Sequence, residues 1–338
     1  MIKTKNVVTI GGGAGSFTLL SGLKKYPINL SAIVSMADDG GSTGVLRDEL
    51  GVLPPGDVRQ CLVALSDSTE TLRALMNFRF EGGGLSGHNF GNLFLSALEK
   101  IKGSFALGAE EAAEILNVKG EVIPVSEENM KLHIKLNNKK VLVGENHLDH
   151  NADVREKGVQ SVYLQPKVKA YRKALAAIKA ADFIIIGPGD HFGSIIPNLL
   201  VSGIAGAIKK SRAKVIYNCN LTNKKGQTEK FDVERYVDEI NSYIGKNRID
   251  IVTVNSKNIP AKLIAKYEKR EGRGTIVELG DRNAERSFKI ALANLLNDAP
   301  IKKTKGDPDA DSHSFIRHDP NKLARVLMAI MEISKHKG

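Results

Sequence analysis

The sequence predicts an α/β protein with a Rossmann-like, doubly wound and mostly parallel sheet. Short apolar runs recur along the chain, and each stops at glycine or polar residues before a helical pattern begins. Such runs end near residues 10, 36, 186 and 218. This alternation of strand, turn and helix is typical of a parallel sheet with crossover helices on its faces. The length of 338 residues suits one large domain, which we place at residues 1–338.

One segment departs from this pattern and predicts a small antiparallel β insertion within the domain. Between residues 118 and 150 the chain becomes extended, and Leu132, Ile134 and Leu136 alternate with charged or polar side chains. Alternation with a period of two indicates a half-buried strand. The segment at residues 147–150 carries two histidines, which resemble a metal-binding pair only superficially, and we interpret it as a solvated loop.

Composition excludes several classes of protein. No apolar run approaches the ~20 residues that span a bilayer, and no signal peptide is visible at the N-terminus, so we expect a cytoplasmic protein without a membrane span. The net charge of +11 is spread along the chain without an aromatic-interleaved basic motif. This pattern favours phosphate-bearing small ligands over nucleic acid. Cys61 and Cys219 are too few for a disulfide framework, and we expect two buried thiols.

The first apolar run ends in a glycine-rich segment, residues 11–15, that leads into a helix. Glycines let a phosphate approach the backbone, and the helix N-terminus offers unpaired N–H groups. The segment lacks the Gly-Lys-Ser/Thr of a Walker A loop, and Ser16 stands where the dinucleotide fingerprint has its third glycine. We interpret it as a nucleotide or phosphate cradle, while a tight turn alone stays the alternative. Its predicted contacts are Gly11, Gly12, Gly13 and Gly15.

Adjacent carboxylates follow the second apolar run. Ligands of an open parallel sheet bind beyond the carboxyl ends of its strands, so we expect Asp38 and Asp39 beside the glycine-rich segment. They are suited to hold a ribose, a substrate hydroxyl or a divalent metal that bridges phosphates, although helix capping is the simpler alternative. After a Pro-Pro-Gly turn, Asp57 is predicted to be the N-cap of its own helix.

Further polar groups follow later glycine clusters and strands. Side chains at one helix start are suited to contact a sugar or phosphoryl group, although a lone histidine there is more often structural. Later strand-end turns repeat the design of a loop followed by a helix start. The candidates from these segments are Ser86, His88, Asn89, Asn92, Gly187, Gly189, Asn198 and Asn220.

Taken in order, these segments resemble the CofD/YvcK-like family. The matching motifs are Gly-Gly-Gly-Ala-Gly at 11–15, Ala-Asp-Asp-Gly-Gly-Ser at 37–42, Leu-Pro-Pro-Gly-Asp-Val-Arg at 53–59, Leu-Ser-Gly-His-Asn-Phe-Gly-Asn at 85–92, Gly-Pro-Gly at 187–189, Ile-Pro-Asn-Leu-Leu at 196–200 and Ile-Arg-His-Asp at 316–319. The Leu-Pro-Pro-Gly-Asp run and the β insertion are more similar to the gluconeogenesis factor branch than to the 2-phospho-L-lactate transferase branch.

The resemblance implies a regulatory protein that binds a nucleotide sugar, UDP-N-acetylglucosamine, or a similar dinucleotide ligand. It would link carbon metabolism during gluconeogenic growth to cell-wall synthesis and cell shape, with a protein partner in cell-wall regulation and a homodimeric state. The family's ligand-contacting tyrosine and arginine fall on Tyr267 and Arg317.

The other branch implies an enzyme. It would move a phospholactyl group from a nucleotide-activated donor to a deazaflavin, with Mg²⁺ held by Asp38 and Asp39 as the catalytic residues. The absence of Trp and an aromatic content of 5% count against a flavin-stacking site. Three departures from the family pattern bear on sugar preference: Ala14 replaces a threonine, residues 190–194 replace a Ser-x-Tyr-Thr-Ser segment, and the Asp-His pair that follows the Gly-x-Thr in the family is absent at Val233-Glu234.

Overall fold

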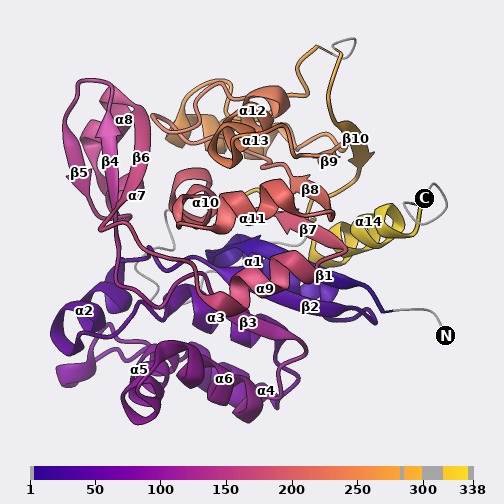
Figure 1. Cartoon of the computed structure of the whole chain (residues 1–338). Coiled ribbons are helices and arrows are strands. Elements are labelled where there is room, and N and C mark those ends of the chain that lie inside the picture. The colour runs from indigo at the N-terminus through magenta and orange to yellow at the C-terminus, as the bar shows by residue number, and fades with distance from the viewer. Residues whose placement is uncertain (1–3, 282–284, 299–314, 334–338) are drawn as a thin grey trace.

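A seven-stranded parallel sheet forms the centre of the computed structural model, which describes residues 4–281, 285–298 and 315–333 (Figure 1). Its strand order is β10-β9-β8-β7-β1-β2-β3, and every neighbouring pair is parallel. The predicted fold class is therefore confirmed. The strands are β1 (Asn6–Gly11), β2 (Asn29–Val34), β3 (Glu121–Pro124), β7 (Phe183–Ile186), β8 (Lys214–Asn218), β9 (Ile251–Asn255) and β10 (Lys289–Ala293).

The central strands are apolar because helices cover both faces of a parallel sheet. All four residues of β7 are buried, and β1 is buried from its second residue onward. The edge strand β10 is only partly covered. These short, buried runs bounded by glycines are the features that made the strands recognisable in the sequence.

The direction of winding reverses beside β1. From β1 the chain continues to β2 and β3 on one side, whereas β7 to β10 extend the sheet on the other side. β1 and β7 are neighbours, with Ile10 paired to Ile186, so their two following loops leave the sheet side by side. Ligands of such sheets bind at this point of reversal.

Helix α1 (Gly13–Leu23) starts directly after β1 and packs against α3 (Gly56–Leu65) and α14 (Pro320–Ile333). The N-terminal and C-terminal parts of the chain thus share one layer. The other helices are α2 (Gly41–Leu50), α4 (Glu70–Asn77), α5 (Phe90–Lys102), α6 (Phe105–Ile115), α9 (Arg172–Ala180), α10 (Ile196–Leu200), α11 (Ile204–Lys210), α12 (Val233–Ile244) and α13 (Ala261–Glu271), with a 3₁₀ turn η1 (Gly83–Leu85) and a π-helical turn η2 (His191–Ile195).

A small antiparallel sheet stands to one side of the main sheet in Figure 1. Its order is β5-β4-β6, and the apolar residues of the predicted alternation are buried. The strands are β4 (Lys131–Leu136), β5 (Val141–Val143) and β6 (Val159–Gln165), and two short helices, α7 (His147–His150) and α8 (Ala152–Lys157), connect β5 to β6.

The boundaries of this sheet differ from the predicted insertion at residues 118–150. β3 pairs with β2 in the main sheet, and β6, which completes the small sheet, begins after residue 150. β3 is too short for its pattern to reveal which sheet it joins, because a buried edge strand and a buried hairpin strand look alike over four residues.

Two simpler expectations concern bulk properties. Cys61 and Cys219 are buried free thiols, as predicted. Across the described residues, none of the helices combines the length and apolarity that a bilayer crossing demands.

Candidate functional site

A cavity of about 350 Å³ lies at the carboxyl ends of β1, β2, β7 and β8. Its wall is formed by the loops that follow these strands, together with α7, the starts of α1, α2, α3 and α5, one residue of α13 and the segment just before α14. This volume is within the usual range for small-molecule sites. The cavity therefore occupies the place where the strand-end motifs predicted a ligand.

The glycine-rich segment is shaped by close packing as much as by ligand access. A Cβ on Gly15 would lie 2.1 Å from the carbonyl oxygen of Pro188, so only glycine lets α1 approach the loop after β7. Gly12, Gly13 and Gly15 line the cavity. The carbonyl of Gly11 points away from it and accepts a hydrogen bond of 3.0 Å from the buried Asn198 side chain.

In the loop after β7, too, one glycine lines the cavity and another supports the wall from behind. Gly189 lines the cavity, and its carbonyl accepts a hydrogen bond of 3.0 Å from Asn220, which joins the loops after β7 and β8. Gly187 lies behind the cavity wall, where its carbonyl accepts a hydrogen bond of 2.9 Å from the side chain of Asn218. Of the predicted contacts, Gly11, Gly187 and Asn198 therefore support the wall from behind.

The predicted role of Asp57 is wrong. Helix α3 begins at Gly56 after Pro55, and no side chain caps it. The Asp57 carboxylate packs against the start of α1 instead, where the backbone of Gly13 acts to lower its pKa. A Cβ on Gly12 would lie 2.2 Å from Oδ2 of Asp57. The packing of α3 against α1 thus places the Asp57 carboxyl group beside the start of the neighbouring helix, a position that local sequence cannot reveal.

Buried carboxyl groups crowd this part of the wall. Burial, with a further contribution from the Asp38 charge, raises the pKa of Asp57 to about 8, although the Gly13 N–H and Arg59 act in the opposite direction. Burial also raises the pKa of Glu145 well above its usual range, and the charges of Asp38 and Asp190 add to this effect. Some of these carboxyl groups are therefore protonated near neutral pH.

The adjacent aspartates serve different purposes. Asp38 lines the cavity and accepts a 3.0 Å hydrogen bond from the backbone N–H of Gly40. Asp39 points toward the small sheet, where it accepts 2.8 Å from the backbone N–H of Asn146. The pair does not converge on one ion. In residues 4–281, 285–298 and 315–333 there is no group of three or more His, Cys, Asp or Glu side chains placed to hold a metal.

The candidates at the start of α5 mostly lie outside the cavity wall. Ser86 is exposed, and His88 Nδ1 lies 3.2 Å from the Ser42 hydroxyl. Asn89 is buried as the N-cap of α5 and accepts from the backbone N–H of Asn92. Asn92 alone of these four lines the cavity, where its Oδ1 accepts 2.9 Å from Arg59. The loop before α5 runs over the surface, so Ser86 lies away from the strand ends, and His88 reaches the cavity wall only through Ser42.

Tyr267 and Arg317 lie in the wall of the same cavity, although they are far along the chain from the glycine-rich segment. Tyr267 is 1% exposed, and its hydroxyl accepts 3.0 Å from the hydroxyl of Thr222. The Arg270 guanidinium stacks over the Tyr267 ring at 4.8 Å. The structure thus brings together the two residues that the resemblance implied and the glycine cradle.

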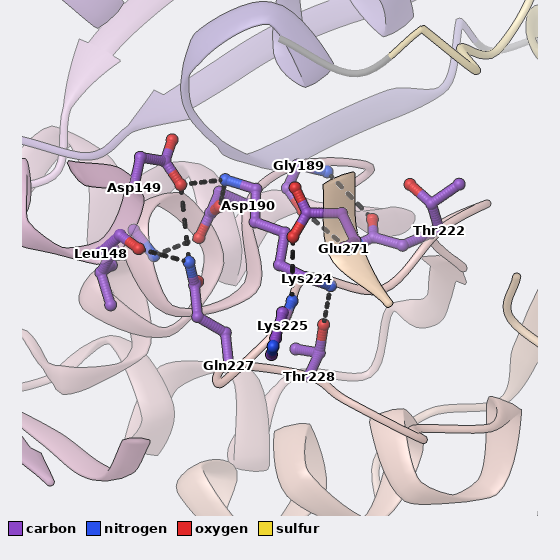
Figure 2. Close-up of polar contacts among 12 residues, drawn as sticks. Leu148, Asp149, Gly189, Asp190, Thr222, Lys224, Lys225, Gln227, Thr228 and Glu271 are labelled. Carbon is purple, nitrogen blue, oxygen red and sulfur yellow. Dashed lines mark hydrogen bonds and ion pairs between the residues drawn. The ribbon is translucent and has the colours of Figure 1, made fainter. Parts of the chain in front are cut away.

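Sequence reasoning missed the group around Lys224 (Figure 2). The Lys224 ammonium lies 2.6 Å from Asp149 of α7 and 2.5 Å from Asp190 of the loop after β7. Burial lowers the pKa of Lys224, but Asp190 and Asp149 outweigh burial and raise it overall. Gln227 also donates 2.8 Å to the carbonyl of Leu148. Residues 147–150 are therefore not a solvated loop: Asp149 is held in the cavity wall and ties the small sheet to the main sheet.

Comparison with known proteins places the chain. The family model described as 2-phospho-L-lactate transferase CofD matches residues 7–296. The chain belongs to the CofD family. The gluconeogenesis factor of Halalkalibacterium halodurans is 42% identical to this CofD-family chain over 329 residues, which cover 97% of each protein. That of Bacillus subtilis is 35% identical over 336 residues, or 98% of this chain and 100% of the relative.

Solved structures agree with this assignment. A crystal structure of a Bacillus halodurans protein matches the CofD-family chain with a TM-score of 0.85 and 37% identity, covering 96% of this chain and 100% of the other. The mostly parallel sheet with a small antiparallel sheet is thus a shared fold.

The segment that departs from the family pattern has clear roles in this CofD-family protein. Asp190 pairs with Lys224 and also accepts 2.7 Å from the backbone N–H of Gly193 at the start of η2. His191 is 2% exposed and packs edge-on against Phe231 and Tyr236. Burial lowers the pKa of His191 to about 4, so its ring is neutral.

The raised pKa of Asp57 makes stability depend on pH. The unfolded aspartate has a pKa near 4. Between about pH 4 and 8 the folded protein therefore binds a proton that the unfolded chain does not, so the free energy of unfolding of the wild type falls as pH rises through this range. Asp57→Asn keeps the shape of the side chain but does not ionise. We expect its Tm to exceed that of wild type by about 2 °C or more at pH 9, with little difference at pH 5. Parallel Tm curves from pH 5 to 9 would contradict this reading.

Removing the Lys224 ion pairs should weaken the attachment of the small sheet to the main sheet. Lys224→Met leaves Asp149 and Asp190 without their cation, so we expect a loss of about 1–3 kcal/mol in the free energy of unfolding. Hydrogen exchange should accelerate first in residues 131–165. Lys225→Met, at the exposed neighbouring position, is the matched control and should leave exchange unchanged. Equal exchange in both variants would mean that the pairs do not hold the small sheet.

Proposed function

We propose that this protein binds a nucleotide sugar of the UDP-N-acetylglucosamine type in the strand-end cavity and acts as a regulator without turnover. The observation that carries the proposal is the convergence of Tyr267 and Arg317 with the start of α1 on one cavity. The two parts come from distant segments of the chain, and together they bring a tyrosine, a cation and backbone N–H groups to one wall.

Each part suits one piece of such a ligand. The start of α1 and the loop at Gly189 offer backbone donors and a helix dipole to a diphosphate. Arg317 adds a positive charge, and Tyr267 lies in the same wall with its hydroxyl held by Thr222. The wall near Gln227 and Thr228 offers polar groups for sugar hydroxyls. These features support a ligand with a base, a diphosphate and a sugar.

The regulatory part of the proposal is supported by the relatives. Proteins that match over nearly the whole chain are named gluconeogenesis factor. We therefore extend the proposal to control of carbon metabolism in gluconeogenic growth, linked to cell-wall synthesis and cell shape through a protein partner. A homodimer in the cytoplasm is part of the same proposal.

A thermal-shift titration with UDP-N-acetylglucosamine tests ligand binding. We expect Tm to rise, since ligand at about 100 times Kd contributes ~2.7 kcal/mol to stability. Arg317→Ala should remove the shift. Arg325→Ala, at an exposed position of α14, is the matched control and should keep it. Absence of a shift with every uridine nucleotide would overturn the proposal.

The name of the matching family model favours one alternative, a transferase of the 2-phospho-L-lactate type. An assay with Mg²⁺, a deazaflavin acceptor and a nucleotide-activated lactate donor tests it by mass spectrometry of the products. Our first proposal predicts no product above the protein-free control. Product that disappears in Asp38→Asn would establish the transferase instead, because Asp38 lines the cavity.

A further inference from the structure

Tyr267 packs outside the main apolar core. It belongs to a smaller cluster with the buried side chains of Leu221, Leu296 and Ile316. Its ring meets that of Phe315 edge-on, at a centroid distance of 6.1 Å and an angle of 84°. Apolar burial is not directional, so contacts of this kind do not by themselves fix the orientation of a side chain. The polar and charged neighbours of Tyr267 therefore decide how it stands in the cavity wall.

Arg270 covers the Tyr267 ring from one helical turn further along α13. Its guanidinium carbon lies 4.8 Å from the ring centroid of Tyr267 and 4.7 Å from that of Phe315. Side chains three residues apart share one face of a helix, so Arg270 reaches Tyr267 directly. A cation at such distances is attracted to both rings. Arg270 thus holds a side chain of the cavity wall against the ring beside it.

A buried carboxylate keeps Arg270 in this position. Glu271 is 7% exposed, and its Oε1 accepts 2.8 Å from Nε of Arg270. Its Oε2 accepts 3.1 Å from Arg155 and 3.1 Å from the backbone N–H of Lys225. Burying a carboxylate costs free energy unless cations and hydrogen-bond donors offset the loss of water. Glu271 has both, so Arg270 is held by a fixed partner.

The simpler interpretation is that this group only attaches the small sheet to α13. Arg155 comes from α8, donates to Glu271 and also donates to the backbone carbonyl of Arg270. This attachment uses the Arg155 and Glu271 side chains and requires no aromatic contact. Attachment alone therefore does not account for the Arg270 guanidinium in the angle between two rings.

We propose that Arg270 is a positioning residue for ligand binding: it holds the Tyr267 side chain in the cavity wall, where the ligand contacts it, and Glu271 fixes Arg270. Thr222 donates 3.0 Å to the Tyr267 hydroxyl, so the ring and the hydroxyl each have a partner that orients them. Among the residues that the structure describes, Arg270 does not line the cavity and acts through Tyr267. The inference rests on the proposed function in that Tyr267 contacts the ligand.

Fluorine NMR of the free protein, labelled with 3-fluorotyrosine, tests the position of Tyr267 without a ligand. The Tyr267 signal is identified by its loss in Tyr267→Phe. We expect Arg270→Leu to shift and broaden this signal more than any other tyrosine signal, because the cation that holds the ring is gone. Arg273→Leu removes a cation from an exposed position just after α13 and is the matched control, which should leave the signal unchanged.

Isothermal titration with UDP-N-acetylglucosamine measures the consequence for binding. We expect Arg270→Leu to bind at least about fivefold more weakly than wild type, in keeping with the loss of a partly buried cation–π contact. Arg273→Leu should bind as wild type does. In a Tyr267→Leu background, Arg270→Leu should cause no further loss, because the ring through which it acts is absent. If Arg270→Leu does not fold, Arg270→Lys keeps the charge without the planar group and is expected to shift the signal and weaken binding to a smaller extent.

An unchanged Tyr267 signal in the Arg270 variant overturns the inference, and so does an affinity equal to that of wild type. An equal loss of affinity in the Tyr267→Leu background also overturns it, since Arg270 would then act through another group. A shifted Tyr267 signal, in a protein whose wild type binds no uridine nucleotide, would support Arg270 as the residue that positions Tyr267 and would contradict the nucleotide-sugar proposal.

Discussion

The contact between the first turn of α1 and the loop after β7 is the constraint on which the site depends. Gly15 and the carbonyl of Pro188 are so close that any side chain at position 15 would force the two segments apart. Because β1 and β7 belong to opposite halves of the sheet, this contact joins the halves where the winding reverses. The cavity, the cradle and the support from Asn198 all depend on that junction.

The site also depends on how the negative charges of the cavity wall are balanced. Lys224 offsets Asp149 and Asp190, and this group also fixes the small sheet against the main sheet. Burial raises the pKa of Asp57 and of Glu145, so these two groups carry less charge near neutral pH than their number suggests. An anionic ligand and a carboxyl-rich wall are therefore compatible in one cavity.

The sequence allowed the fold and the position of the cavity to be predicted because both follow from local patterns: buried strands that stop at glycines, and the rule that strand ends share an edge. Asp38 and Asn220 were found in this way. The role of Asp57 was missed because it depends on the packing of α3 against α1, and Asp149 was missed because its partner Lys224 comes from a distant segment. The small sheet was misplaced at its ends because short strands do not show which sheet they join.

A crystal structure of the protein with UDP-N-acetylglucosamine tests the central claim most directly. Our account predicts the base end of the ligand near Tyr267 and Arg317 and the diphosphate at the start of α1. A ligand bound elsewhere, or one whose diphosphate lies away from the start of α1, would contradict it.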